Sequence, residues 1–272
     1  EADPDPMNRG GWVVMVAIAD VASYVKPGSA LDKEARSRGN SVYFPDRVVP
    51  MLPERISNHL CSLQAEEPRP CLAVRMVFDK DGRKRGHRFM RGLMRSAAAL
   101  AYEQAQAAID GNPDDTTGPL LDPVLRPLWG AYGSLTRARA ERAPLDLDLP
   151  ERKIQLDEEG RVRGVTTPPR LDAHRLIEEF MIAANVAAAE ELEAKRTPLI
   201  YRVHDQPSKE KLVALGEFLG TLGIKLPKTG QIKPAHFNRI LAETRASPAA
   251  ELVGEMILRS QAQAEYNSGN FG

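Results

Sequence analysis

The sequence predicts an α+β fold in which a mixed sheet containing hairpins is surrounded by helices. Residues 12–19 form a continuous apolar run of strand length. Asp79-Lys-Asp-Gly82 and Asp157-Glu-Glu-Gly160 each separate two strand-like segments, and Asp and Gly supply the backbone geometry of a hairpin turn. Helical segments are intermixed with these hairpins, so strictly alternating parallel βαβ units are less favoured.

Apolar runs and turn signals place the strands. The run at 12–19 suits a strand buried on both faces, and residues 1–6, with two prolines, predict a turn entering it with no partner strand before it. The two Asp-to-Gly turns each need a strand on either side. We expect strands over 12–19, 71–78, 84–94, 153–156, 161–167 and 198–203.

Helical rhythm, alanine content and proline boundaries place the helices. Residues 171–195 form the longest such stretch, and residues 123–142 form an amphipathic one that ends in a basic cluster. We expect helices over 29–38, 96–110, 123–142, 171–195, 208–222, 234–244 and 249–264.

Composition limits the classes of function. The 272 residues carry 37 basic and 37 acidic side chains, so the chain lacks the overall positive charge typical of a nucleic-acid binder, and a nucleic acid would need a locally basic groove. No run approaches the roughly 18 apolar residues of a membrane span, and no signal segment begins the chain. Cys61 and Cys71 are predicted to be buried reduced thiols in preference to a disulfide, which suits a cytoplasmic protein. We also expect no membrane contact.

Residues 39–63 form the most informative segment. Pro45, Pro50 and Pro53 interrupt any helix, yet apolar residues recur throughout, which predicts an ordered segment without a regular element. Long irregular segments inside a packed domain are often functional.

The long helix carries a polar stripe. At 100° per residue, His174, Glu178 and Asn185 lie within about 40° of one another. The stripe is either a solvated edge with an ordinary His174–Glu178 pair or a functional surface, because Asn185 sits among small apolar residues and a buried amide needs partners. The stripe borders an expected apolar face of Ile177, Phe180, Met181, Ala184, Ala187 and Ala188.

Two tyrosines and a row of arginines are candidates for nucleic-acid contact. Tyr43 and Tyr102 could stack on bases, or be half-buried tyrosines with bonded hydroxyls. Arg91 and Arg95 share strand parity with Arg83 and Arg85, so they could contact phosphates or protect an exposed sheet edge. The spacing of histidines and cysteines predicts no metal site, and no glycine-rich phosphate loop occurs.

Seven blocks in order resemble the catalytic domain (RNB domain) of the ribonuclease II / ribonuclease R family of exoribonucleases, most closely its bacterial ribonuclease R branch. They span about 250 residues, which makes the resemblance highly specific. The blocks are Val16-Ala-Ile-Ala-Asp-Val21, Pro27-Gly-Ser-Ala-Leu-Asp32, residues 43–63, Arg91-Gly-Leu-Met-Arg-Ser96 leading to Tyr102, His174-Arg-Leu-Ile-Glu-Glu-Phe-Met-Ile-Ala-Ala-Asn185, Tyr201-Arg-Val-His-Asp-Gln-Pro-Ser208 and Leu258-Arg-Ser-Gln-Ala-Gln-Ala264.

The resemblance implies a processive hydrolytic 3′-to-5′ exoribonuclease that degrades single-stranded RNA to nucleoside 5′-monophosphates. It implies a monomeric cytoplasmic hydrolase whose acidic residues hold Mg²⁺ to activate the attacking water. It also gives Tyr43 the role of stacking near the terminal nucleotide, Tyr102 that of a second RNA contact, and Glu178 that of contacting the terminal nucleotides. The family's aromatic clamp partner aligns with Leu147, which cannot stack as a phenyl ring does.

Parts of the family pattern lie outside the chain. The catalytic aspartate cluster should precede the first block, and a His-Phe-Gly segment and an arginine motif should follow Gly272. Cold-shock and S1 RNA-binding domains are also absent. We therefore expect residues 1–272 to be a partial catalytic domain, truncated at both ends and inert by itself, with metal ligands elsewhere. The alternative is an RNA-binding module from a catalytically inactive member of the family.

Overall fold

A computed structural model describes residues 1–147, 149–227 and 232–271. The chain divides into two compact units. The first comprises Glu1–Ala138 and Arg152–Ala187, and the second comprises Arg139–Glu151 and Ala188–Gly272. Each unit has its own hydrophobic core.

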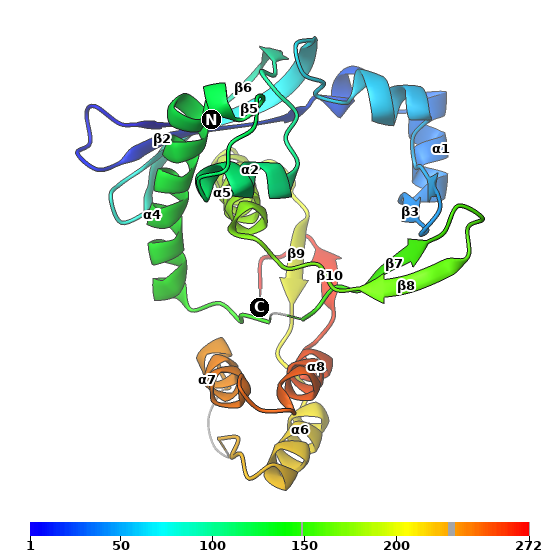
Figure 1. Ribbon diagram of the computed structural model, residues 1–272, viewed down its shortest axis with the longest axis vertical. Coiled ribbons are helices and arrows are strands. Elements are labelled where there is room, and N and C mark those ends of the chain that lie inside the picture. The colour runs from blue at the N-terminus through cyan, green and yellow to red at the C-terminus, as the bar shows by residue number, and fades with distance from the viewer. Residues whose placement is uncertain (148, 228–231, 272) are drawn as a thin grey trace. The chain divides into compact units, whose positions relative to one another are not determined.

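The described strands and helices confirm the α+β class (Figure 1). The strands are β1 (Ala2–Pro4), β2 (Trp12–Ala19), β3 (Val42–Tyr43), β4 (Val48–Val49), β5 (Pro68–Phe78), β6 (Lys84–Arg95), β7 (Lys153–Leu156), β8 (Val162–Thr166), β9 (Tyr201–His204) and β10 (Ala264–Asn267). The helices are α1 (Ala30–Arg38), α2 (Tyr102–Ile109), α3 (Gly118–Leu120), α4 (Arg126–Arg142), α5 (Asp172–Ala194), α6 (Lys209–Thr221), α7 (Pro234–Thr244) and α8 (Ala250–Ser260), with short 3₁₀ or π turns at Val21–Ser23, Arg55–Leu60 and Leu121–Leu125.

The main sheet lies in the first unit and has the strand order β1-β2-β5-β6. Each of its three strand pairings is antiparallel, so the expectation of a mixed sheet is wrong in this detail. For two of the pairings the physical reason is that short connections, residues 5–11 and 79–83, join β1 to β2 and β5 to β6, because a parallel pair needs a crossover of a dozen residues or more.

The first residues form a strand, which corrects the expectation of a turn without a partner strand. Ala2 pairs with Val14 and Pro4 with Trp12, and the Ala2 side chain is 1% exposed. A proline is tolerated here because β1 is an edge strand, where a missing N–H need not break the hydrogen-bond ladder.

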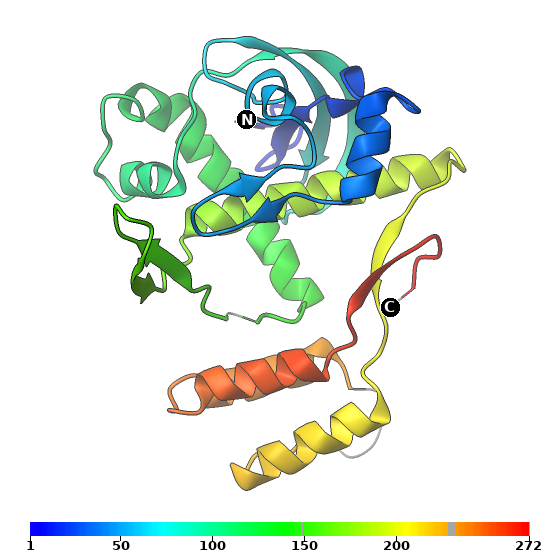
Figure 2. The same cartoon turned by 90° about the vertical axis from the view of Figure 1, so that its right-hand side faces the viewer.

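One face of the sheet packs against α4 and α5, which lie beside the sheet strands in Figures 1 and 2. Val14 and Met76 are fully buried in this core, whereas Ile18, on the same face near the end of β2, is 58% exposed. The side chains of β2 on the opposite face are only partly buried, so the expectation that β2 is buried on both faces is wrong. On the opposite face the half-buried Met15 pairs with the exposed Arg75, so that face carries charge as well as apolar surface.

The two predicted hairpins are confirmed, and each turn is closed by an aspartate. The Asp79 Oδ1 atom accepts hydrogen bonds from the Asp81 and Arg83 N–H groups, as Asp157 Oδ1 does from Glu159 and Arg161. Burial raises the pKa of the Asp79 carboxyl, but these hydrogen bonds and the nearby Arg85 guanidinium outweigh burial and lower the pKa overall.

Helix α2 begins later than expected because β6 continues to Arg95 and Ala101 keeps an extended backbone. The loop after it is organised by Asp114, whose carboxylate accepts hydrogen bonds from the Thr117 N–H at 2.8 Å and from Gln104 Nε2 at 2.7 Å. Thr117 Oγ1 also donates to it, and the Thr117 side chain is fully buried. The hydrogen bond from the Thr117 N–H is the largest cause that lowers the pKa of Asp114 to about 2.

This carboxylate should make stability depend on pH under acidic conditions. Because the pKa in the folded state lies below the ordinary value near 3.9, its stabilising effect is complete above about pH 4 and is lost as pH falls towards 2. We expect Asp114→Asn to lower the melting temperature at pH 6, and the difference from wild type to shrink between pH 4 and pH 2. Thermal unfolding followed by circular dichroism measures this, with Asp115→Asn as the control. A difference that stays constant with pH would contradict the assignment.

The second unit contains α6, α7 and α8 around a separate core of Leu215, Leu219, Phe237, Ile240, Val253 and Ile257. Strands β9 and β10 pair antiparallel and run side by side in Figure 2. The helix expected over 249–264 ends at Ser260, because Gln261 takes an extended backbone and its amide binds the Ile257 carbonyl. Among the described residues, no helix combines the length and apolar character needed to cross a membrane.

Candidate nucleic-acid interface

Tyr43 lies in a small hairpin within the proline-rich segment. Strands β3 and β4 pair through Tyr43 and Val48, and the Phe44 N–H donates to the Arg47 carbonyl at 2.8 Å. The Arg47 guanidinium lies 5.0 Å from the centre of the Phe44 ring. Tyr43 is 77% exposed, so its ring is accessible to a ligand. The prediction of an ordered segment is confirmed. The segment nevertheless contains regular elements, this hairpin and a π turn, which its prolines gave no reason to expect.

Tyr102 and His174 form a stacked pair. Their ring centres are 4.1 Å apart and the ring planes differ by 26°. The His174 Nδ1 atom accepts from the Leu171 N–H at 3.2 Å, which fixes the imidazole at the start of α5. A further hydrogen bond from the Ala173 N–H to Gln106 Oε1 joins α5 to α2. The two helix starts thus build a platform of two rings, with Tyr102 43% exposed.

The residues of the polar stripe on α5 do not share one environment. Glu178 is half-buried and forms an ion pair with Arg170, whereas Asn185 is exposed, so its amide needs no protein partner. The expected apolar face is also wrong in part, since Ile177 is 39% exposed and Met181 is 56% exposed. Packing against the sheet rotates the buried side of the helix. That side consists of Ala173, Leu176, Glu179, Phe180 and Ala187.

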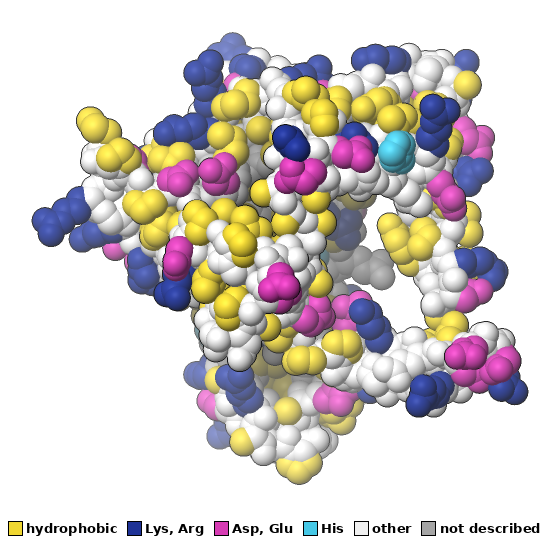
Figure 3. All heavy atoms as spheres, turned by 45° about the horizontal axis from the view of Figure 1, so that its top comes forward, with side chains coloured by type: hydrophobic (Ala, Val, Ile, Leu, Met, Phe, Trp, Pro, Cys, Tyr) yellow, Lys and Arg dark blue, Asp and Glu magenta, His cyan; other side chains and the backbone are white. Residues whose placement is uncertain are grey.

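Arg91 and Arg95 are both bound to carboxylates. Arg91 Nε lies 3.2 Å from Asp20 Oδ2, and an Arg95 terminal nitrogen lies 2.6 Å from Glu66 Oε2. Both guanidinium groups are about two-thirds exposed. On the face in Figure 3, basic and acidic side chains are interspersed, in agreement with the zero net charge.

All seven residues predicted to contact RNA lie in the first unit, whereas Leu147 lies in the second. Leu147 packs against the helical core of that unit together with Leu145. Its side chain therefore has a packing role that sequence alignment alone did not indicate.

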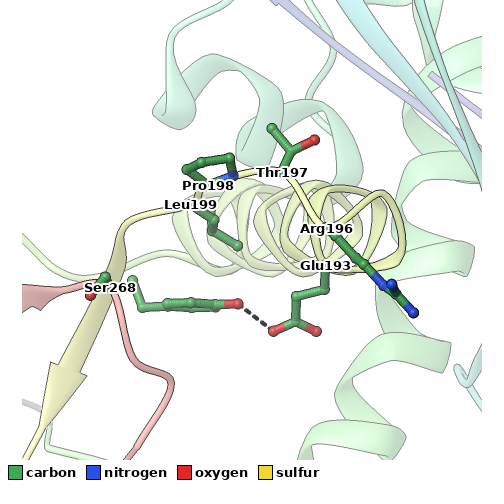
Figure 4. Close-up of a pocket in the computed structure, with 7 residues that line it drawn as sticks. Glu193, Arg196, Thr197, Pro198, Leu199 and Ser268 are labelled. Carbon is green, nitrogen blue, oxygen red and sulfur yellow. Dashed lines mark hydrogen bonds between the residues drawn. The ribbon is translucent and has the colours of Figure 1, made fainter.

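Sequence reasoning missed a shallow pocket of about 390 Å³ in the second unit. Figure 4 shows Glu193 in the last turn of α5 and Arg196 just after the helix. Glu193 accepts a hydrogen bond from the Tyr201 hydroxyl. That bond raises the pKa of Tyr201. Six of its seven lining residues lie between positions 193 and 201, and Ser268 alone comes from a distant part of the chain. Its lining residues are Glu193, Arg196, Thr197, Pro198, Leu199, Tyr201 and Ser268.

The sequence matches the family described as RNB domain over residues 4–272, which is almost the whole chain. The chain belongs to the RNB domain family. Ribonuclease R of Escherichia coli is 40% identical over 268 residues, and ribonuclease R of Aquifex aeolicus is 39% identical over 265. Each alignment covers 97% of this chain, but only 33% and 38% of those proteins. The RNB-family chain thus spans about a third of the length of these relatives.

The fold agrees with this membership. The structure of Mycoplasma genitalium RNase R in complex with ribose-methylated single-stranded RNA is similar to this chain with a TM-score of 0.89 and 31% identity. That similarity covers 98% of this chain and 42% of the other. The RNB fold expected from the sequence is confirmed.

Proposed function

We propose that this RNB-family chain is part of a longer, processive 3′-to-5′ exoribonuclease that degrades single-stranded RNA to nucleoside 5′-monophosphates. The observation that carries the proposal is the match over 98% of the chain to a ribonuclease R solved with single-stranded RNA. The exposed Tyr43 hairpin and the Tyr102–His174 platform support it, because aromatic rings bind single strands by stacking on bases.

Within this proposal, five of the seven predicted site residues have distinct tasks. Tyr43 stacks near the terminal nucleotide, and Tyr102 stacks on another base with His174 behind its ring. Glu178 accepts hydrogen bonds from ribose hydroxyls, since an ionised carboxylate has only acceptor oxygens and would repel phosphate. Asn185 offers an exposed amide on the same helix. The hydroxyl contact would favour RNA over DNA.

We propose Mg²⁺ as a cofactor of the longer protein only. Among the described residues, no group of three or more histidine, cysteine or acidic side chains could hold a metal ion. The described residues therefore do not fit Mg²⁺, and we propose that its ligands lie elsewhere in the polypeptide. We propose further that the parent protein is a monomer in the cytoplasm.

Hydrolysis of 5′-labelled oligoadenylate by the longer protein tests this function. With Mg²⁺, we expect degradation from the 3′ end that converts the labelled RNA to a short end product with few intermediates, together with release of adenosine 5′-monophosphate. The 272-residue chain by itself should bind the RNA without cutting it and should bind the matching DNA more weakly. RNA binding without hydrolysis by the longer protein would support an inactive RNA-binding member instead. Absence of RNA binding would overturn both.

A further inference from the structure

Arginine side chains hold the segment from residue 39 to residue 67 through its main-chain oxygens. Arg38 donates to the Pro50 carbonyl at 3.1 Å, Arg69 to the His59 carbonyl at 3.3 Å, and Arg95 to the Glu66 carbonyl at 2.9 Å. An irregular segment leaves carbonyl groups without ladder partners, and these donors satisfy three of them. The three arginines come from α1, β5 and β6, which are regular elements.

The contact between Arg95 and Glu66 is the most complete of these. Arg95 Nε binds the Glu66 carbonyl, while a terminal nitrogen binds Glu66 Oε2 at 2.6 Å. The Glu66 N–H donates to the Ser96 carbonyl at 2.7 Å, so hydrogen bonds run in both directions. Glu66 has a φ of +63°, a strained value for a residue with a side chain, which surrounding contacts must maintain. One guanidinium thus fixes both the backbone and the side chain of Glu66 against β6.

Arg91, which lies on β6 like Arg95, is also bound to a carboxylate. It pairs with Asp20, whose side chain is only 7% exposed and also accepts from Ser23 Oγ at 2.8 Å. Removing the partner of a buried carboxylate is costly. An RNA phosphate that recruited Arg91 would have to compensate for that loss.

We propose that Arg95 positions the Tyr43-bearing segment by holding Glu66 against β6, instead of contacting an RNA phosphate. This inference rests on the proposed function, because it assumes that the segment binds RNA. Arg95 is then a positioning residue whose partner is an acidic side chain. The carboxylate and a phosphate would compete for the same guanidinium nitrogen, so the two roles predict opposite effects of removing Glu66.

Affinity for fluorescein-labelled oligoadenylate, measured by fluorescence anisotropy on the 272-residue chain, distinguishes the roles. We expect Glu66→Ala and Arg95→Ala to weaken binding by a similar factor, on the order of fivefold, and the double variant to be no weaker than either single one. Alanine keeps the backbone strain at residue 66 comparable, because it also has a Cβ atom. Unchanged or tighter binding by Glu66→Ala would overturn the inference.

The dependence of affinity on salt gives a second readout. Loss of a phosphate contact would reduce the slope of log K against log salt concentration by about 0.7 for a single strand, whereas loss of a positioning contact leaves it unchanged. Arg88→Ala is the matched control, since it removes an exposed positive charge from the same strand. Hydrogen exchange of residues 61–67 should accelerate in Arg95→Ala and not in Arg88→Ala. A reduced slope or unaltered exchange in Arg95→Ala contradicts positioning, whereas wild-type protein that binds no RNA contradicts the proposed function.

Discussion

Replacing Gly82 by alanine should lower the free energy of unfolding of the first unit by about 3 kcal/mol or more. Gly82 has a φ of +78°, and a Cβ atom there would lie 2.1 Å from the Ser134 carbonyl oxygen of α4. A backbone atom of a packed helix cannot move aside cheaply, so the turn between β5 and β6 would separate from α4. Urea unfolding followed by circular dichroism measures the change.

Gly160 provides the matched control, because its turn has the same Asp-to-Gly spacing and a φ of +77° but nothing within 4 Å of its Cβ position. Gly160→Ala should cost only the strain of the left-handed backbone, about 1–2 kcal/mol. Equal losses in the two variants would show that the contact with α4 contributes nothing beyond backbone strain.

Tyr43→Ala should weaken binding of oligoadenylate on the order of tenfold or more, because stacking on an aromatic ring contributes about 1–3 kcal/mol per base. The melting temperature should stay within a degree or two of wild type, since the side chain is 77% exposed and buries little surface on folding. Anisotropy titrations at constant salt concentration measure the affinity.

Two further variants make this test specific. Tyr43→Phe should retain most of the affinity, because the phenyl ring preserves the stacking face. Tyr266→Ala removes a comparably exposed tyrosine, 73% exposed and in the second unit, and should leave affinity within twofold. Loss of affinity in Tyr43→Phe as large as in Tyr43→Ala would refute stacking as the role of this residue.

The parts of the fold that sequence predicted well are those that local chemistry decides. The two hairpin turns were predictable because an aspartate and a glycine act within five residues of each other. Strand β1 was not predictable, because the prolines at positions 4 and 6 suggest a turn and only pairing with β2 makes residues 2–4 a strand. The buried side of α5 was also misjudged, since the sheet decides which residues face the core and Glu179 is buried there.

In the candidate site, too, local features were predictable from sequence and tertiary contacts were not. Residue types and the family resemblance predict Tyr43, Tyr102 and Glu178 as site residues without information about their surroundings. Contacts between distant residues, such as the Tyr102–His174 stack and the Glu66–Arg95 pair, have no sequence signal because they depend on tertiary structure. Leu147 likewise matches a clamp position by alignment, yet packs in a helical core.

The main-chain anchors of the proline-rich segment affect which substitutions it can accept. Arg69 binds the carbonyl oxygen of His59, an atom that every amino acid possesses, so the identity of the side chain at position 59 does not determine that contact. The path of the main chain at these positions therefore depends largely on arginines outside the segment. In related sequences, the residues whose carbonyl oxygens accept these hydrogen bonds can change while the main chain keeps the same conformation, provided that the donor arginines are retained.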